Sequence, residues 1–86
     1  MRLFRLFKNL NIALSEDQQF LNIDYRPSSP KPLYDICDEN GRIIKTGKIT
    51  RESMKVAVND LLSSAYIFLI LDGDQIRKQR FEINRQ

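Results

Sequence analysis

Two apolar segments joined by a polar corner occupy residues 66–81, which read Tyr66-Ile67-Phe68-Leu69-Ile70-Leu71-Asp72-Gly73-Asp74-Gln75-Ile76-Arg77-Lys78-Gln79-Arg80-Phe81. The first segment is rich in aromatic and β-branched residues and the corner contains glycine, so the pattern predicts a β-hairpin. Apolar side chains at both odd and even positions of residues 65–71 predict a central strand that is covered on both faces. Residues 76–84 alternate apolar and charged side chains, which predicts an outer strand with one solvent-exposed face.

A second hairpin is predicted at residues 33–45. Strand-forming residues 33–37 precede Asp38-Glu39-Asn40-Gly41, a polar turn in which asparagine and glycine tolerate positive φ, and residues 42–45 form the returning strand. Thr46-Gly47-Lys48 is expected to relax the chain into a bulge or a bend. The acidic residues of this turn and of residues 72–74 are expected to be solvated turn formers.

The remaining strands are predicted from period-two alternation of apolar and polar residues. This alternation covers residues 21–25 and again residues 54–58. All three prolines fall within residues 27–32, which predicts a loop, because proline donates no backbone hydrogen bond. Residues 59–64 form the next connection, with or without one short helical turn. The fold class is therefore all-β: a small antiparallel immunoglobulin-like β-sandwich of six or seven short strands, spanning residues 19–84.

Residues 1–14 form a basic amphipathic segment that precedes this sandwich. Apolar side chains recur there at three- and four-residue spacing, with cations between them: Leu3, Leu6, Phe7, Leu10 and Leu14, with Arg2, Arg5 and Lys8. The spacing fits a helix that docks on a membrane surface or on a partner. The alternatives are a terminal segment that covers the sandwich, with a strand at residues 10–14, or an irregular tail.

Length and charge exclude several classes of protein. The 86-residue chain is expected to form one domain with a modest core. Its net charge of +3 is uneven, since residues 9–74 carry seven basic and ten acidic side chains while both ends are basic. This distribution is poor support for nucleic-acid binding, and no nucleic-acid partner is expected. No apolar run approaches the ~20 residues of a membrane-spanning helix, so no integral membrane segment is expected.

The chain contains few of the side chains that commonly act in catalysis or bind metal ions. The chain has no histidine and one cysteine, which excludes Ser-His-Asp and Cys-His catalytic arrangements and the usual zinc ligand sets. Cys37 lies in an apolar strand and is expected to be a small buried side chain. Neither polar turn has the spacing of a dedicated calcium loop, and no phosphate-binding glycine motif occurs. We therefore expect no enzyme activity, no catalytic residue, no metal and no cofactor.

From about residue 20 to residue 84, the order of features resembles the C-terminal sorting domain of type IX secretion system cargo proteins of Bacteroidetes. That family has a short strand, similar to Leu21-Asn22-Ile23, before a tyrosine-aspartate hairpin whose turn ends in Gly-Arg or Gly-Lys. Tyr34-Asp35-Ile36 and Gly41-Arg42-Ile43-Ile44 match this hairpin. A glycine-bearing bend follows in the family, as at Gly47.

The resemblance continues to the end of the chain. An alternating strand resembles residues 56–58, and the family's Leu-x-x-Gly-x-Tyr junction resembles residues 61–66, with Ser64 in place of the glycine. The family then has a polar turn, similar to residues 72–74, and a final strand with a basic pair, similar to residues 78–80. The Pro-Asn-Pro that commonly opens the family's domain has no counterpart in this chain.

The resemblance implies a non-enzymatic sorting signal, which components of the outer-membrane translocon recognise in the periplasm. Its partner-recognition residues would be Gly41, Arg42, Lys78, Gln79 and Arg80. The alternative explanation of the cations among them is that they protect exposed strand edges and keep the domain soluble. The expected location is then the cell surface or the medium. The alternative is a stand-alone protein-interaction module, peripheral to a membrane through residues 1–14; without a signal peptide, such a module is expected in the cytoplasm.

Overall fold

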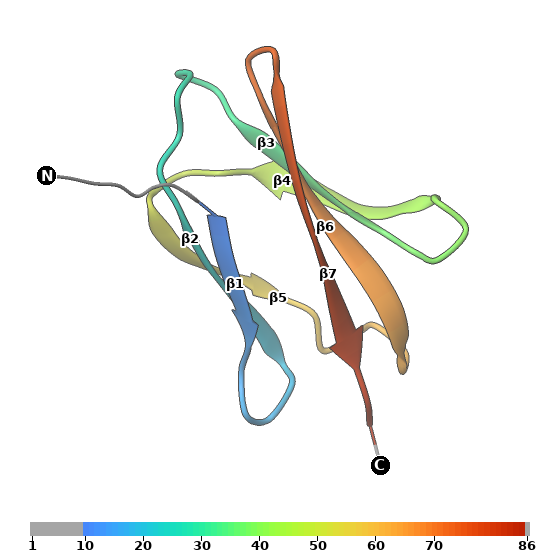
Figure 1. Cartoon of the computed structure of the whole chain (residues 1–86). Coiled ribbons are helices and arrows are strands. Elements are labelled where there is room, and N and C mark those ends of the chain that lie inside the picture. Colours follow the sequence, from blue (N-terminus) through green and yellow to red (C-terminus); the bar gives the residue numbers. More distant parts are fainter. Residues whose placement is uncertain (1–9, 86) are drawn as a thin grey trace, which may run out of the picture.

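The computed structural model describes residues 10–85, and residues 1–9 and 86 lie outside the description. Its elements are seven strands: β1 (Leu10–Leu14), β2 (Phe20–Tyr25), β3 (Leu33–Cys37), β4 (Ile43–Lys48), β5 (Ser53–Ala57), β6 (Ser64–Asp72) and β7 (Gln75–Ile83). They form two antiparallel sheets with the strand orders β1-β2-β5 and β4-β3-β6-β7 (Figure 1). The predicted all-β antiparallel sandwich is confirmed, with seven strands. The fourth strand joins the second sheet, whereas constant-type immunoglobulin domains place it in the first.

The core lies between the two sheets and takes one side of each strand. Its fully buried apolar side chains come from both sheets and from the residue that follows β5: Leu21, Ile23 and Tyr25 from β2, Ile36 from β3, Val58 just after β5, Phe68 and Ile70 from β6, and Ile83 from β7. The predicted inward positions of residues 21–25 and residues 81–83 are confirmed. Burial of these apolar surfaces supplies the main driving force for pairing the sheets, at about 25 cal/mol per Å².

The sandwich begins at β1, because Leu10–Leu14 pairs along its whole length with β2. Leu10 is only 5% exposed, and Ile12 and Leu14 pack against the core. A helix over these five residues is therefore wrong, and the strand alternative is confirmed. The helical interpretation of residues 1–9 lies outside the described residues. Within residues 10–85, no helix is long and apolar enough to cross a membrane.

Strand β6 is central in its sheet, with β3 on one side and β7 on the other. Its even-numbered side chains from Tyr66 to Asp72 are buried, but Ile67, Leu69 and Leu71 are only partly covered. The prediction that both faces are covered is wrong, because the sandwich has two layers and nothing in residues 10–85 lies over this outer face. Cys37 is buried, as expected, and burial raises the pKa of its thiol.

Strand β4 runs to Lys48 without the interruption expected at residues 46–48, and the register shift lies instead near the turn, at Ile36 and Cys37. Gly47 has a packing role. A Cβ at Gly47 would lie 2.6 Å from a ring carbon of Tyr34, so its absence lets that ring lie across the strand. Tyr34 there stacks on Phe68 with the ring centroids 5.4 Å apart. The predicted turn at residues 38–41 is confirmed, with Gly41 at φ +81°.

The connection from β5 to β6 contains no helical turn; Leu61 N–H donates to the carbonyl of Val58 at 3.0 Å in a tight turn. The Tyr66 hydroxyl donates to the carbonyl oxygen of Leu62 at 2.6 Å. A tyrosine near the start of this strand that bonds back to the preceding corner is the tyrosine corner of immunoglobulin-like sandwiches. The spacing from Leu61 to Tyr66 is thus explained by the geometry of the corner.

The buried carboxylate of Asp72 joins the two sheets at one end of the sandwich. Asp72 is 1% exposed, and its oxygens accept hydrogen bonds from the hydroxyls of Tyr25 and Ser29 and from Ser28, whose amide lies at 2.7 Å and hydroxyl at 3.1 Å. Burial by itself would raise the pKa of Asp72, but these donors hold it well below its usual range. The expectation that Asp72 is a solvated turn former is wrong.

The opposite end of the sandwich is closed by polar contacts of Asn84 and Arg85, the two residues that follow β7. The side-chain amide of Gln18 exchanges two hydrogen bonds with the backbone of Asn84, at 2.9 and 2.8 Å. The Arg85 guanidinium donates to three backbone carbonyls, those of Val58, Leu61 and Gln18, at 2.7–3.0 Å. The end of β7 is thereby tied to the β1–β2 and β5–β6 connections.

Replacing Asp72 by Asn should lower the free energy of unfolding by about 1–3 kcal/mol, because an amide cannot accept from all the donors and the charge that strengthens these bonds is lost. Urea unfolding followed by circular dichroism measures the change. Asp74→Asn is the matched control, since Asp74 is exposed in the adjacent turn. Equal unfolding midpoints for the two variants would contradict the role of Asp72.

The same cluster predicts how stability depends on pH. The pKa of Asp72 is lowered, so its contribution is present above about pH 4 and is lost as the pH falls below the unfolded-state value. Burial and the bond to Asp72 raise the pKa of Tyr25 to about 12, so the contribution of Tyr25 is present below about pH 10 and is lost as the pH rises towards 12. Urea midpoints measured across pH should fall at both extremes. Tyr25→Phe should show a smaller alkaline fall, and an unchanged one would contradict the assignment.

Candidate recognition surface

The two outer faces of the sandwich differ in chemistry. On the sheet β1-β2-β5, the outward side chains are mostly small or polar, as at Asn22, Asp24, Ser53 and Lys55. On the sheet β4-β3-β6-β7, six outward side chains are large and apolar: Leu33, Ile43, Ile67, Leu69, Leu71 and Ile76. We call these six residues the outer band. The second sheet is therefore the side on which a partner can gain apolar contacts.

Strand register shows how the outer band is arranged. Leu71 of β6 pairs with both Leu33 of β3 and Ile76 of β7, so these three form one apolar row across the sheet. Leu33 is 42% exposed and Ile76 is 60% exposed. Within residues 10–85 no third layer lies over these side chains, although their neighbours cover part of Leu71. Water must be displaced from the exposed parts when a partner docks.

Two predicted site residues border the outer band. Lys78 is opposite Leu69 and Arg80 is opposite Ile67, and both cations are exposed on the outer face. Gln79 is opposite Phe68, so its side chain points to the other side of β7 and is half-buried. Successive side chains of a strand point to opposite faces, which separates Gln79 from the two cations.

Gly41 and Arg42 lie in the β3–β4 turn, where Asp38 organises the backbone. The Asp38 carboxylate accepts the amides of Asn40 and Arg42, both at 2.9 Å, and the Arg42 Nε at 3.1 Å. The bond from the Arg42 amide, with the smaller contributions of the Arg42 side chain and the Asn40 amide, lowers the pKa of Asp38. The charge of Arg42 is thus partly compensated within its own turn, although its side chain is exposed.

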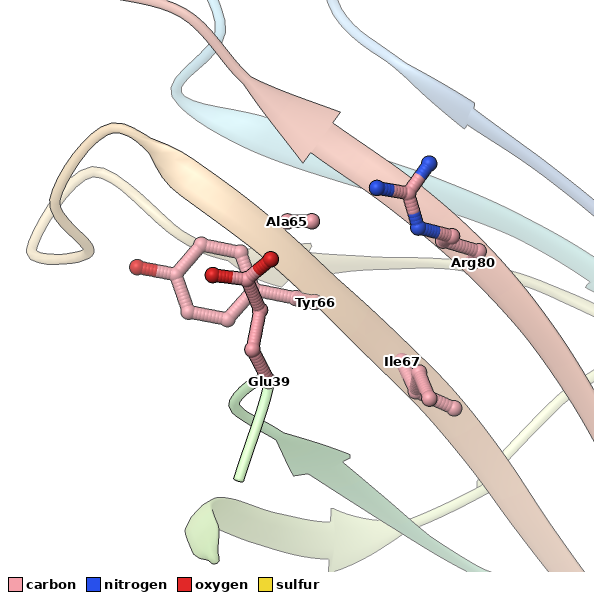
Figure 2. Close-up of a pocket in the computed structure, with 5 residues that line it drawn as sticks. All are labelled: Glu39, Ala65, Tyr66, Ile67 and Arg80. Atoms are coloured by element: carbon pink, nitrogen blue, oxygen red, sulfur yellow. The ribbon is translucent and has the colours of Figure 1, made fainter. Parts of the chain in front are cut away.

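A hollow of about 190 Å³ brings this turn and strand β7 together over β6. Figure 2 shows Glu39 of the turn and Arg80 of β7 projecting from either side of β6 around Ala65, with Tyr66 and Ile67 completing the lining. Ligand pockets usually measure about 300–1,000 Å³, so this hollow fits one side chain of a protein partner better than a cofactor. Glu39 at one end of the hollow can bind a cationic group, and Arg80 at the other end can bind an anionic group.

Glu39 was not among the predicted site residues, and it is the acidic member of the hollow. Its position in a polar hairpin turn is the one signal in the sequence, but only the tertiary pairing of β3 with β6 brings that turn beside Arg80. The structure thus brings together Arg80 and the turn that contains Gly41 and Arg42, while Lys78 lies two residues further along β7.

Charged and apolar side chains together line this candidate surface. In the described part of the chain, no group of three or more Asp, Glu or Cys side chains is placed to hold a metal ion. No protein-family model matches the chain, and no curated protein matches it. The junction at residues 61–66 is explained by the tyrosine corner of the fold.

Reversing the charges of Lys78 and Arg80 should leave stability almost unchanged, within about 0.5 kcal/mol, because both side chains are exposed and bonded to no other described residue. Phe81→Ala, on the buried side of the same strand, should instead lower the free energy of unfolding by about 3–5 kcal/mol. Urea unfolding of the Lys78→Glu/Arg80→Glu variant and of Phe81→Ala tests this contrast. A large loss in the charge variant would show that the cations stabilise the fold.

Proposed function

We propose that this chain is a non-enzymatic sorting domain, similar to the C-terminal domains that direct cargo through the type IX outer-membrane translocon. The translocon would read the domain as a folded surface. In this proposal the outer band, bordered by Lys78 and Arg80, is the surface that the partner contacts. The domain catalyses nothing and needs no cofactor.

The observation that carries the proposal is the difference between the two outer faces. A stable two-layer sandwich needs apolar side chains only between its sheets, yet the outer band adds large apolar side chains on one outer face. Exposed apolar patches on small domains commonly mark interaction sites. The cations at the edge of the band, Lys78 and Arg80, would orient a partner on the surface. Charge complementarity favours the correct encounter and disfavours wrong partners.

The closed ends of the sandwich support recognition of a folded surface. Asn84 and Arg85 are bonded to Gln18 and to the β5–β6 connection, so the end of β7 is held against the sandwich. Asp72 fixes the other end. A partner therefore meets side chains on a preorganised sheet, which reduces the entropy lost on binding.

A stand-alone interaction module is the second candidate. The tyrosine corner favours it, because this feature belongs to immunoglobulin-like sandwiches in general and accounts for one of the motifs that the sorting family shares with this chain. Such a module would use the same outer band but would act without attachment to an exported cargo. The two proposals differ in their dependence on the translocon.

A reporter fusion tests the sorting role. A fluorescent reporter with a signal peptide is fused to the N-terminus of residues 1–86 and expressed in a bacterium that has the type IX system, with and without a working translocon. We expect surface or medium fluorescence only with the working translocon. Lys78→Glu/Arg80→Glu should reduce export by ~10-fold, the effect of losing about 1.4 kcal/mol of recognition energy.

The matched control is Arg51→Glu/Lys55→Glu, which makes the same charge change at exposed positions outside the outer band. This control should export normally. Periplasmic retention of the wild-type fusion in both strains would reject the sorting role and favour the stand-alone module. Normal export of the Lys78 and Arg80 variant would reject the outer band's cations as recognition residues.

A further inference from the structure

A separate groove of about 350 Å³ lies where the proline-rich loop enters β3 and the chain leaves β4. Its lining combines four apolar residues with two lysines and a threonine: Pro30, Pro32, Leu33 and Ile49, with Lys31, Lys48 and Thr50. The volume is sufficient for a leucine-sized side chain with part of its backbone. The groove is on edge strand β4, whereas Lys78 and Arg80 are on β7, the opposite edge of the same sheet.

The walls of the groove are held in place before any ligand binds. Ser28 and Ser29, which precede Pro30, are both bonded to the buried carboxylate of Asp72. The rings of Pro30 and Pro32 restrict the backbone of the loop further. At the other wall, the amide of Ile49 donates to the carbonyl of Pro32 at 3.0 Å. A preformed site loses little conformational entropy on binding.

The edge of β4 next to the groove has unpaired backbone groups. Ile49 and Pro32 face each other as a backbone hydrogen-bonded pair. Because hydrogen-bonded and non-hydrogen-bonded pairs alternate along an antiparallel ladder, Gly47 and Lys45 also point their amides towards β3. The N–H and C=O groups of Thr46 and Lys48 must therefore point away from β3. In residues 10–85 no further strand pairs with β4 on that side. This edge is open to an added strand.

The lysines beside the β4 edge favour an added strand that carries acidic side chains. Lys45 is paired with Asp60 at 2.9 Å, but among the described residues no acid lies within ion-pair distance of Lys31 or Lys48. Asp35, on the same face, is opposite Thr46 and is not bonded to Lys48. A second copy of this edge would bring like charges together, which disfavours self-pairing. An acidic strand is complementary.

We propose that the β4 edge and its groove bind an extended acidic peptide as an added strand. The peptide's backbone pairs with Thr46 and Lys48, an apolar side chain enters the groove over Leu33 and Ile49, and the flanking carboxylates meet Lys31 and Lys48. Main-chain bonds supply affinity in this mode of recognition, and the groove with its lysines supplies selectivity. The groove shares Leu33 with the outer band, but the binding of a peptide here does not depend on the band's proposed role in sorting.

A blocked synthetic peptide of alternating glutamate and leucine is the probe, titrated into the isotope-labelled 86-residue chain and followed by amide chemical shifts. We expect the shifts to concentrate at residues 30–33 and 46–50. Lys31→Glu/Lys48→Glu should weaken binding by at least ~10-fold, and Lys55→Glu, on the other sheet, should leave it nearly unchanged. The same peptide N-methylated on the residues facing β4 should bind at least ~10-fold more weakly, because it cannot donate to the edge.

Several outcomes would overturn the proposal. Absence of binding at millimolar peptide would reject the site, as would shifts confined to β7 and residues 38–42. Equal binding of the N-methylated peptide would reject strand addition, and saturation of the same amides by octanoate alone, with no gain from a peptide backbone, would identify an amphiphile site instead. Thermal unfolding of each variant is measured alongside, and Leu33→Asn gives a second variant that leaves both lysines in place.

Discussion

The carboxylate of Asp72 is buried and is stabilised by hydroxyl and amide donors, and no cation of residues 10–85 forms an ion pair with it. A buried charge is costly unless its hydrogen bonds are complete, so the donors and the carboxylate must be arranged together. Tyr25 comes from the other sheet, and Ser28 and Ser29 come from the loop between them. This requirement sets how the sheets align at this end, how the proline-rich loop runs, and where the groove beside β4 is formed.

The surface of the molecule is organised around one sheet. The sheet β4-β3-β6-β7 has the outer band in its middle, cations along β7 and an open edge with two lysines at β4. The sheet β1-β2-β5 has a polar outer face, where Lys55 lies over the ring of Phe20 at 5.6 Å. The apolar and cationic groups that a partner can contact are therefore concentrated on the sheet β4-β3-β6-β7.

The residues that carry the proposed similarity to the type IX sorting family have different physical explanations. The corner at Leu61 to Tyr66 follows from a hydrogen bond that closes the β5–β6 connection, and Gly47 is required because the ring of Tyr34 lies against it. Both features are therefore explained by the packing and hydrogen bonding of the fold. Lys78 and Arg80, by contrast, have no bonded partner among residues 10–85 and do not support the core, so they are the part of the resemblance that a folding requirement does not explain.

Local pattern by itself determined the strands, the hairpin turn at residues 38–41 and the burial of Cys37, because a strand's two faces differ in solvation and glycine tolerates positive φ. Local pattern could not determine the secondary structure of Leu10–Leu14, because that sequence is compatible with a helix or a strand. Pairing with β2 makes it a strand. Only the tertiary structure decided that no third layer within residues 10–85 lies over the outer face of β6, that Asp72 is buried rather than solvated, and that Glu39 and Arg80 line one hollow. Each depends on contacts between residues distant in the sequence, which no local spacing encodes.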